Sequence, residues 1–291
     1  MKALVCFKVF YWKPSEYEAS SSPEDEDMEK PLSHEALAKQ GVEKQGLEKH
    51  TIAQAQGLTK RFGTTLAVEE VSFQVQAGEV LGILGANGSG KTTLLRMLSG
   101  LMRPTSGSIH IEGMDIEDAS QKARQKVGFL TGNTRLYEKL TPRDILHIFG
   151  ELYGLEKPAL SARIECLAKE MQLHAFLDKR CGQLSSGMRQ RVSVARALIA
   201  DPSLYILDEP TATLDPMASN DIVALVKKAK ARGRAVVFST HRMEEVEYLC
   251  DRVLFLRGGR MATQGTLEAL KQQSGRSRLT DIFLYFAQGE T

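Results

Sequence analysis

The chain has 291 residues, of which 42% are hydrophobic and 25% are charged, as in an ordinary globular protein of one or two domains. A formal net charge of +2 gives no reason to expect a polyanionic ligand, so the sequence predicts no nucleic-acid partner. No apolar run reaches the roughly 20 residues that a membrane crossing needs, and the scattered cysteines lack metal-ligand spacing. The cysteines therefore indicate free thiols in a reducing compartment, and any membrane crossing would belong to another polypeptide.

Residues 1–50 differ in composition from the rest of the chain. An apolar opening, MKALVCFKVFYW, precedes the acidic run EYEASSSPEDEDMEKP and a loose five-residue repeat, ALAKQGVEKQGLEKH. Such a segment has too little apolar surface to offset the entropy lost on ordering. We therefore expect a mostly disordered N-terminal extension, with the folded region beginning at Thr51.

From Thr51 the sequence alternates between strand patterns and helical patterns. TIAQA and VSFQVQ alternate apolar and polar residues, as half-buried strands do. Four continuous apolar runs are typical of strands buried on both faces, and they span residues 80–84, 126–130, 204–207 and 235–240. Helical patterns lie between them, and Thr141, Pro142 and Asp144 form a capped helix start. Buried strands that alternate with helices predict an α/β fold with a mostly parallel sheet.

Three further segments complete the predicted architecture. The strand patterns that follow Thr51 predict an N-terminal antiparallel β subdomain. Residues 141–200 contain helical patterns without a clear strand, which predicts an inserted helical subdomain. Residues 251–265, DRVLFLRGGRMATQG, predict a closing hairpin, and residues 271–291 predict a C-terminal helical tail.

A glycine-rich loop follows the first buried strand and opens a helix. Its sequence, GANGSGKT, fits the phosphate-loop pattern G-x-x-x-x-G-K-[ST] in full. Glycines let backbone N–H groups curl around phosphate oxygens, Lys91 reaches the β- and γ-phosphates, and the Thr92 hydroxyl ligates Mg²⁺. The sequence therefore predicts a P-loop NTPase fold that binds a nucleoside triphosphate, ATP, with Mg²⁺. The expected nucleotide-binding residues in this loop are Gly85, Ala86, Asn87, Gly88, Ser89, Gly90, Lys91, Thr92 and Thr93.

Two acidic residues follow another buried strand, in the run YILDEP. Ligands of open α/β sheets bind beyond the carboxyl ends of the strands, where Gly85 also lies. We therefore expect Asp208 to hold Mg²⁺ and Glu209 to orient or deprotonate the attacking water. His241 follows a third strand at the same edge and is expected to hydrogen-bond the γ-phosphate. The aromatic Phe62 is a candidate for stacking on adenine.

A second candidate anion site lies at LSSGMRQR, residues 184–191. This polar turn leads into a helix expected to start near Met188, and a helix N-terminus attracts anions. Because one triphosphate pocket is already complete, we expect Ser185, Ser186 and Gly187 to contact a nucleotide bound by an opposing subunit. Two copies in a head-to-tail sandwich would then enclose two ATP molecules, and the dimer would open after hydrolysis.

Over about residues 51–270, this order of motifs resembles the nucleotide-binding subunit of an ATP-binding cassette (ABC) transporter. The resemblance implies an ATPase that powers transport through a separate multi-span membrane permease, at the cytoplasmic face of the cell membrane. It also implies a second nucleotide-binding subunit, which is either the same chain or a related one. TATLDP stands in the place of the family's D-loop, with Asp215 as its acidic residue. The loop VGFLTGNTRLYEKLT and the C-terminal helix are most similar to the sodium or multidrug efflux branch, which indicates an exporter.

The sequence departs from the family at two motifs. LSSGM stands for the family's LSGGQ, so Ser186 replaces a glycine, which its backbone angles must permit, and Met188 replaces a polar residue. The family usually has a glutamine that touches Mg²⁺ and the attacking water, and Gly132 stands at that position. Either Asn133 substitutes for this glutamine, or the loop serves only to dock the membrane subunit.

The sequence leaves two alternatives to a transporter ATPase. The first is a soluble ABC ATPase that acts on ribosomes or DNA. The single phosphate loop, the absence of heptads and CxxC motifs, and the near-neutral charge count against it. The second is a catalytically inactive regulatory cassette, which the presence of Lys91, Asp208, Glu209 and His241 disfavours.

Overall fold

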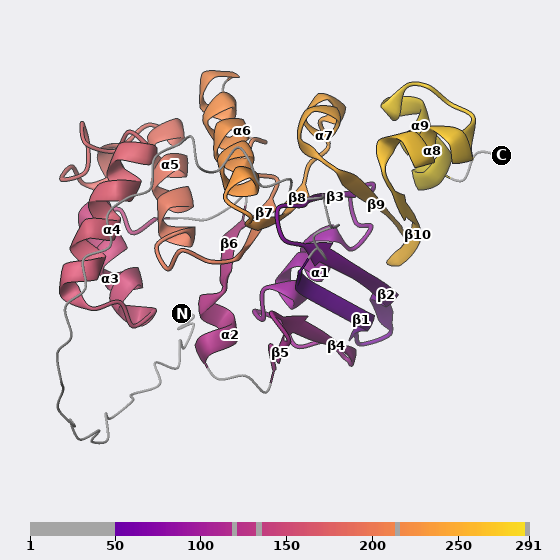
Figure 1. The fold of residues 1–291 in the computed structure, drawn as a ribbon, viewed down its shortest axis with the longest axis horizontal. Coiled ribbons are helices and arrows are strands. Elements are labelled where there is room, and N and C mark those ends of the chain that lie inside the picture. The colour runs from indigo at the N-terminus through magenta and orange to yellow at the C-terminus, as the bar shows by residue number, and fades with distance from the viewer. Residues whose placement is uncertain (1–49, 118–120, 132–135, 213–215, 289–291) are drawn as a thin grey trace, which may run out of the picture. The chain divides into compact units, whose positions relative to one another are not determined.

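The computed structural model describes residues 50–117, 121–131, 136–212 and 216–288, which all belong to one folded unit, Glu48–Thr291 (Figure 1). The expected N-terminal extension thus lies outside the described residues, apart from His50. The strands are β1 (Thr51–Phe62), β2 (Thr65–Gln76), β3 (Val80–Leu84), β4 (Ser106–Ile111), β5 (Met114–Asp115), β6 (Val127–Thr131), β7 (Leu204–Asp208), β8 (Ala235–Ser239), β9 (Arg252–Arg257) and β10 (Arg260–Gly265). The helices are α1 (Lys91–Leu98), α2 (Gln121–Gln125), α3 (Pro142–Leu152), α4 (Lys157–Glu170), the 3-10 turn η2 (Cys181–Gln183), α5 (Ser186–Ala197), α6 (Pro216–Ala231), α7 (Met243–Leu249), α8 (Leu267–Ser274) and α9 (Leu279–Gln288).

The central sheet has six strands in the order β10-β9-β3-β8-β7-β6. Neighbouring strands from β9 to β6 are parallel, and only the pairing of β10 with β9 is antiparallel. This confirms the predicted α/β class, the mostly parallel sheet and the closing hairpin. All residues of β3, β7 and β8 are buried because both faces of the sheet are covered, which explains their continuous apolar runs.

A second sheet, in the order β2-β1-β4-β5, is antiparallel throughout and confirms the predicted antiparallel part of the fold. Its first two strands have 12 residues each and are longer than the TIAQA and VSFQVQ patterns indicate. The pairing of β1 with β2 shifts register at several points, and such bulges interrupt the alternation that a pattern search relies on. The sequence reading also missed the short strands β4 and β5.

Two of the three apolar cores among the described residues lie on opposite faces of the central sheet. On one face of the central sheet, leucines of α1 pack between that sheet and the four-stranded sheet. On the other face, side chains of α3, α4, α5 and α6 form a second core. The arrangement is visible in Figure 1, where α1 and α6 lie on opposite sides of β7 and β8.

The helical stretch begins at the predicted cap. The Thr141 hydroxyl accepts a hydrogen bond from the Asp144 N–H, the Asp144 carboxylate accepts one from the Thr141 N–H, and Pro142 occupies the first turn. The described residues from 142 to 200 contain α3, α4, η2 and α5 and no strand. The helix α5 starts at Ser186, two residues before the predicted start near Met188.

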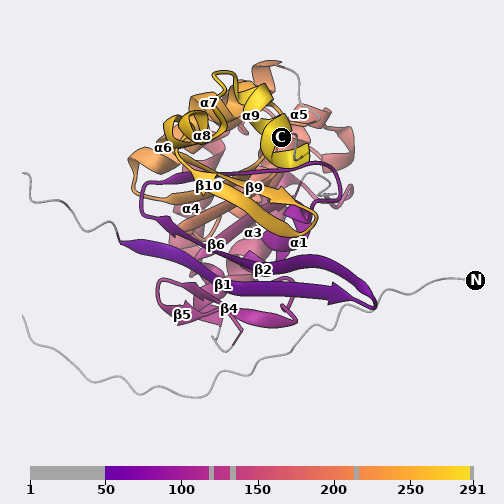
Figure 2. The same ribbon diagram turned by 90° about the vertical axis from the view of Figure 1, so that its right-hand side faces the viewer.

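The C-terminal helix α9 packs on the sheet through one face. Its Leu279, Ile282 and Phe286 are buried, and the Phe286 ring lies 5.4 Å from that of Phe255 in β9. Figure 2 shows α8 and α9 beside the β9–β10 hairpin. Across the described part of the chain, no helix combines the length and the apolar character that crossing a membrane requires.

Candidate nucleotide and catalytic site

Three adjacent parallel strands bring the expected site residues to one edge of the sheet. In the register, Ser239 of β8 pairs with Ile83 of β3 on one side and with Asp208 of β7 on the other. The chain leaves these strands into the phosphate loop, the loop of Glu209 and the loop of His241. The carboxyl ends of β3, β7 and β8 therefore meet where open α/β sheets bind ligands.

Lys91 points back into the phosphate loop. It is buried, and its ammonium donates hydrogen bonds to the carbonyl oxygens of Gly85 at 2.7 Å and Ala86 at 3.1 Å. Burial lowers the pKa of this ammonium, and the carboxylates of Glu209 and Asp208 act in the opposite direction. A cation held inside a loop of backbone amides is suited to meet phosphate oxygens.

The loop requires glycine at two positions. A Cβ on Gly85 would overlap the Ser89 hydroxyl and lie 2.5 Å from the Leu256 carbonyl oxygen. Gly90 has φ of 103° and caps α1 without a side-chain hydrogen bond, so the first N–H groups of α1 are free of a side-chain cap. The Ser89 hydroxyl is buried and has no hydrogen-bond partner among the described residues. These unpaired donors fit an anion such as a phosphate group.

The acidic pair is held by β8. The Ser239 hydroxyl donates to the Asp208 carboxylate at 2.7 Å and accepts from the Glu209 N–H at 3.0 Å. Asp208 is buried, whereas Glu209 is one-third exposed and has φ of 47°, in the left-handed region. The His241 imidazole is exposed, and its Nδ1 lies 3.7 Å from a Glu209 carboxylate oxygen. Glu209 and His241 are therefore neighbours at the open edge.

The residues expected at Mg²⁺ fit that ion by their chemistry. Asp208 supplies a buried carboxylate, and Thr92 supplies a hydroxyl in the first turn of α1. No group of three or more His, Cys, Asp or Glu side chains in the described residues could hold a metal by itself. Mg²⁺ is commonly bound by one or two protein oxygens together with substrate phosphates and water, and Asp208 and Thr92 supply such oxygens.

The signature residues lie away from the chain's own phosphate loop. Ser185 caps α5 and accepts a hydrogen bond from the Met188 N–H at 3.2 Å, while Ser186 and Gly187 form the first turn. The helix α5 packs against β6, which is separated from β3 by β7 and β8. Three strand spacings of roughly 4.8 Å place β6 about 14 Å from β3. The structure therefore does not bring these residues to the phosphate loop of the same chain.

Among the described residues, one further expected residue, Phe62, is not joined to this cluster. Phe62 is half exposed at the end of β1, with the Lys60 ammonium 5.4 Å from its ring centroid. No hydrogen bond or ring contact in the described part of the chain joins Phe62 to the phosphate loop. Asp215 and Asn133 lie outside the described residues, as does Gly132.

Two further polar residues support the loop of Glu209 and were missed by the sequence reading. Gln190 of α5 donates to the Pro210 carbonyl oxygen at 2.9 Å. The buried Glu245 of α7 accepts a hydrogen bond from the Thr211 hydroxyl at 3.0 Å. The sequence does not single out Glu245, because its helix, MEEVEYL, contains three glutamates. Gln190 gives no signal either, because its partner lies in a loop distant in sequence.

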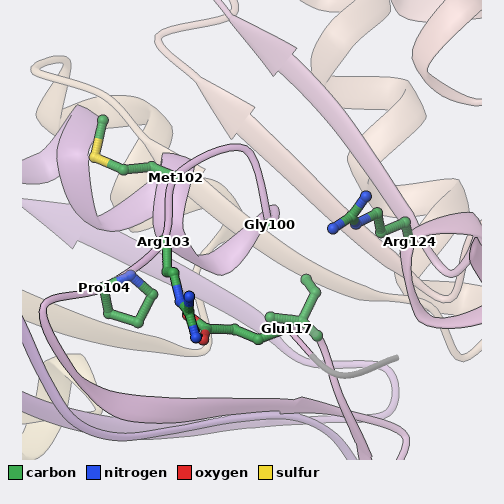
Figure 3. A pocket seen from close by; sticks show the side chains of 7 residues that line it. Gly100, Met102, Arg103, Pro104, Glu117 and Arg124 are labelled. Carbon is green, nitrogen blue, oxygen red and sulfur yellow. The ribbon is translucent and has the colours of Figure 1, made fainter. Parts of the chain in front are cut away.

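An open groove lies between the sheet and the helical stretch, on a different surface from the phosphate loop. It has a volume of about 370 Å³ and is lined by aromatic residues, exposed Leu101 and two arginines, Arg124 and Arg196. Arg196 lies 4.9 Å from the Phe149 ring centroid, and no carboxylate among the described residues forms an ion pair with either arginine. Arg124 also lines a neighbouring pocket of about 210 Å³, into which its guanidinium points (Figure 3).

Comparisons with known proteins place this site in a family context. Residues 68–212 match the ABC transporter family. The chain is 41% identical over 219 residues to the ABC transporter ATP-binding protein NatA of Bacillus subtilis, a match that covers 75% of this chain and 89% of that protein. It is 40% identical over 215 residues to the Nod factor export ATP-binding protein I of Burkholderia lata, covering 74% of this chain and 71% of that protein.

Solved structures give the same result for the fold. The ATP-binding subunit of an ABC transporter matches with a TM-score of 0.76 and 31% identity, covering 81% of this chain and 99% of that one. A dimeric ATP-binding cassette in a post-hydrolysis state, bound to ADP and phosphate, matches with a TM-score of 0.68 and 27% identity. That match covers 74% of this chain and 99% of the other.

Proposed function

The chain belongs to the ABC transporter family as one of its ATP-binding, ATP-hydrolysing subunits, and from this premise we propose how its residues perform that activity. The observation that carries the proposal is the meeting of the phosphate loop, Asp208, Glu209 and His241 at the ends of three adjacent strands. Relatives named as transporter subunits favour this function over a soluble ATPase that acts on ribosomes or DNA.

In the proposed site, the phosphate loop binds the β- and γ-phosphates of ATP. Backbone N–H groups from Gly85 to Thr93 surround the phosphates, and the buried Lys91 exchanges its carbonyl partners for phosphate oxygens. Thr92 and Asp208 would hold Mg²⁺, which would neutralise charge on the phosphates. The half-exposed Phe62 stacks on the adenine ring.

Glu209 orients and deprotonates the water that attacks the γ-phosphate. Its partly exposed carboxylate lies at the open edge and its backbone N–H is held by Ser239, so the group is both positioned and accessible. His241, 3.7 Å from that carboxylate, hydrogen-bonds the γ-phosphate and so reports its presence. Either Asn133 takes the place of the family's glutamine, or its loop serves only to dock the membrane subunit; unchanged ATPase activity of Asn133→Ala would exclude the first.

A second nucleotide-binding subunit completes each site. The first turn of α5 lies far from the phosphate loop of its own chain and carries unpaired backbone N–H groups. Ser185, Ser186 and Gly187 therefore contact the γ-phosphate held by the opposing subunit, and the D-loop residue Asp215 is proposed to act in the same dimer. The similar cassette solved as a dimer with ADP and phosphate supports this arrangement.

The groove beside α3 and α5 binds the separate membrane permease. An apolar side chain of the permease would cover Leu101 and the aromatic residues, and an acidic side chain would pair with Arg124 or Arg196. The assembly would lie at the cytoplasmic face of the cell membrane. Similarity to a Nod factor export protein supports export as its direction.

Replacement of Glu209 tests the catalytic part of the proposal. Glu209→Gln should bind ATP, hydrolyse it at least 100-fold more slowly, and accumulate as a closed dimer at saturating ATP. Light scattering with and without ATP measures the dimer. A Glu209→Gln protein that hydrolyses ATP at the wild-type rate would disprove the role of this residue.

Leu101→Asp tests the docking groove. In a mild-detergent pull-down from the host's membranes, it should lose a multi-span membrane protein that the wild-type chain retains. Tyr248→Asp is the matched control, since Tyr248 is equally exposed but lies on α7, outside the groove. Equal recovery of that membrane protein by both variants would rule out this groove as the docking site.

A further inference from the structure

Glu245 is a buried carboxylate that the proposed function does not use. One of its oxygens accepts two hydrogen bonds, from the Thr211 hydroxyl at 3.0 Å and from the Thr240 hydroxyl at 2.8 Å. Both threonines are also buried. Thr211 is two residues after Glu209, and Thr240 immediately precedes His241. A single oxygen of α7 therefore ties together the two loops that carry the proposed catalytic groups.

The other Glu245 oxygen lies beside a positive charge at the start of the same helix. The Arg242 guanidinium lies 3.0 Å from it and compensates the charge of the carboxylate. A buried carboxylate is retained only where donors and a counter-charge surround it, and Glu245 has both. The polar cluster is thus built around this one side chain.

The loop needs such support because Glu209 has an unfavourable backbone conformation. With φ of 47°, it lies in the left-handed region, which non-glycine residues adopt only when the surroundings hold them there. Ser239 holds the N-terminal side of Glu209, accepting its N–H at both its hydroxyl and its carbonyl oxygen. On the C-terminal side, Gln190 holds the Pro210 carbonyl and Glu245 holds the Thr211 side chain.

We propose that Glu245 is a positioning residue for ATP hydrolysis, which fixes the Glu209 carboxylate relative to His241 through Thr211 and Thr240. The inference rests on the proposed roles of Glu209 and His241. Loss of the carboxylate frees both threonine hydroxyls, so the Glu209 backbone can relax and its carboxylate leaves the position required for attack. We expect nucleotide binding to be unaffected, because no hydrogen bond or ion pair among the described residues joins Glu245 to Lys91 or to the phosphate loop.

Single-turnover hydrolysis by the full-length chain, together with equilibrium binding of ATP, tests this inference. Glu245→Ala should lower the hydrolysis rate about 10- to 100-fold while the Kd for ATP changes less than about threefold. Glu245→Gln should recover most of the rate, since its amide oxygen can accept both threonine hydroxyls. Glu244→Ala is the matched control on the exposed side of the same helix and should keep the wild-type rate.

A milder variant separates positioning from folding. Thr211→Val removes one hydroxyl and leaves Glu245 paired with Thr240 and Arg242, so it should lower the rate in the same direction, while an unchanged Kd for ATP shows that the chain remains folded. A wild-type rate for both Glu245→Ala and Thr211→Val overturns the inference. If those two variants keep the wild-type rate while Glu209→Gln is inactive in the same assay, only the role of Glu245 is disproved. If Glu209→Gln is fully active, the proposed function and this inference fail together.

Discussion

Replacing Ser239 with alanine should destabilise the protein more than other buried Ser-to-Ala replacements do. Ser239 is fully buried, and its hydroxyl donates to the buried Asp208 carboxylate at 2.7 Å. A hydrogen bond to a charged group contributes about 1.5–3 kcal/mol, and its removal leaves the carboxylate oxygen without that donor. In Ser239→Ala the Glu209 N–H keeps its hydrogen bond to the carbonyl oxygen of residue 239, at 3.1 Å in the wild type. Asp208 is therefore the only partner that loses its hydrogen bond to this residue entirely. We therefore expect the free energy of unfolding to fall by about 2 kcal/mol.

Urea unfolding of the full-length chain measures this difference, with Ser193→Ala as the matched control. Ser193 is also buried, but its hydroxyl bonds the Arg189 carbonyl oxygen one turn back in α5. Such a bond stabilises a helix little, so the free energy of unfolding should change by less than about 0.5 kcal/mol. A double-mutant cycle with Asp208→Asn then isolates the charged part of the interaction. If Ser239→Ala and Ser193→Ala unfold at the same urea concentration, the reasoning from the Asp208 contact is refuted.

Three further predictions follow from single observations. Lys91→Ala should lose most of the affinity for ATP and all turnover, measured by equilibrium binding and phosphate release, because the only buried cation described in the phosphate loop is removed. Thr141→Ala should lower the free energy of unfolding by about 1 kcal/mol in urea, since it removes the cap of α3. Burial raises the pKa of the Cys250 thiol to about 12, so at pH 8 it stays protonated. Iodoacetamide should then label the exposed Cys166 and spare Cys250 in the folded chain, as peptide mass spectrometry would show.

The sequence predicts the buried parts of this fold well and its edges poorly. The strands β3, β6, β7 and β8 are found because both of their faces are covered, so each is a continuous apolar run. The cap at Thr141 is found because its signal is local. By contrast, β4 is a six-residue strand that pairs with β1, a partner distant in sequence, and β5 has only two residues and pairs with β4. The pattern of residues within a short segment does not reveal pairing with a distant strand.

The site shows the same division. The phosphate loop and the acidic pair are recognisable because their residues are consecutive and their chemistry is specific. Ser239 and Glu245 act across loops that are far apart in sequence, and each looks like an ordinary polar residue until the strands β7 and β8 are placed side by side. Sequence reading therefore identifies the groups that meet the ligand more readily than the groups that hold them.

The departures of LSSGM from the family's signature are explained by local structure. Ser186 has a negative φ in the first turn of α5, so the backbone permits a side chain where the family has glycine. Met188 is partly buried and packs against the core formed with α3 and α4, while its N–H is bonded to the Ser185 hydroxyl. The position thus contributes a backbone donor to the cap and an apolar side chain to the core. The helix N-terminus that would face a partner's phosphate is preserved by these contacts, although two of the five signature residues have changed.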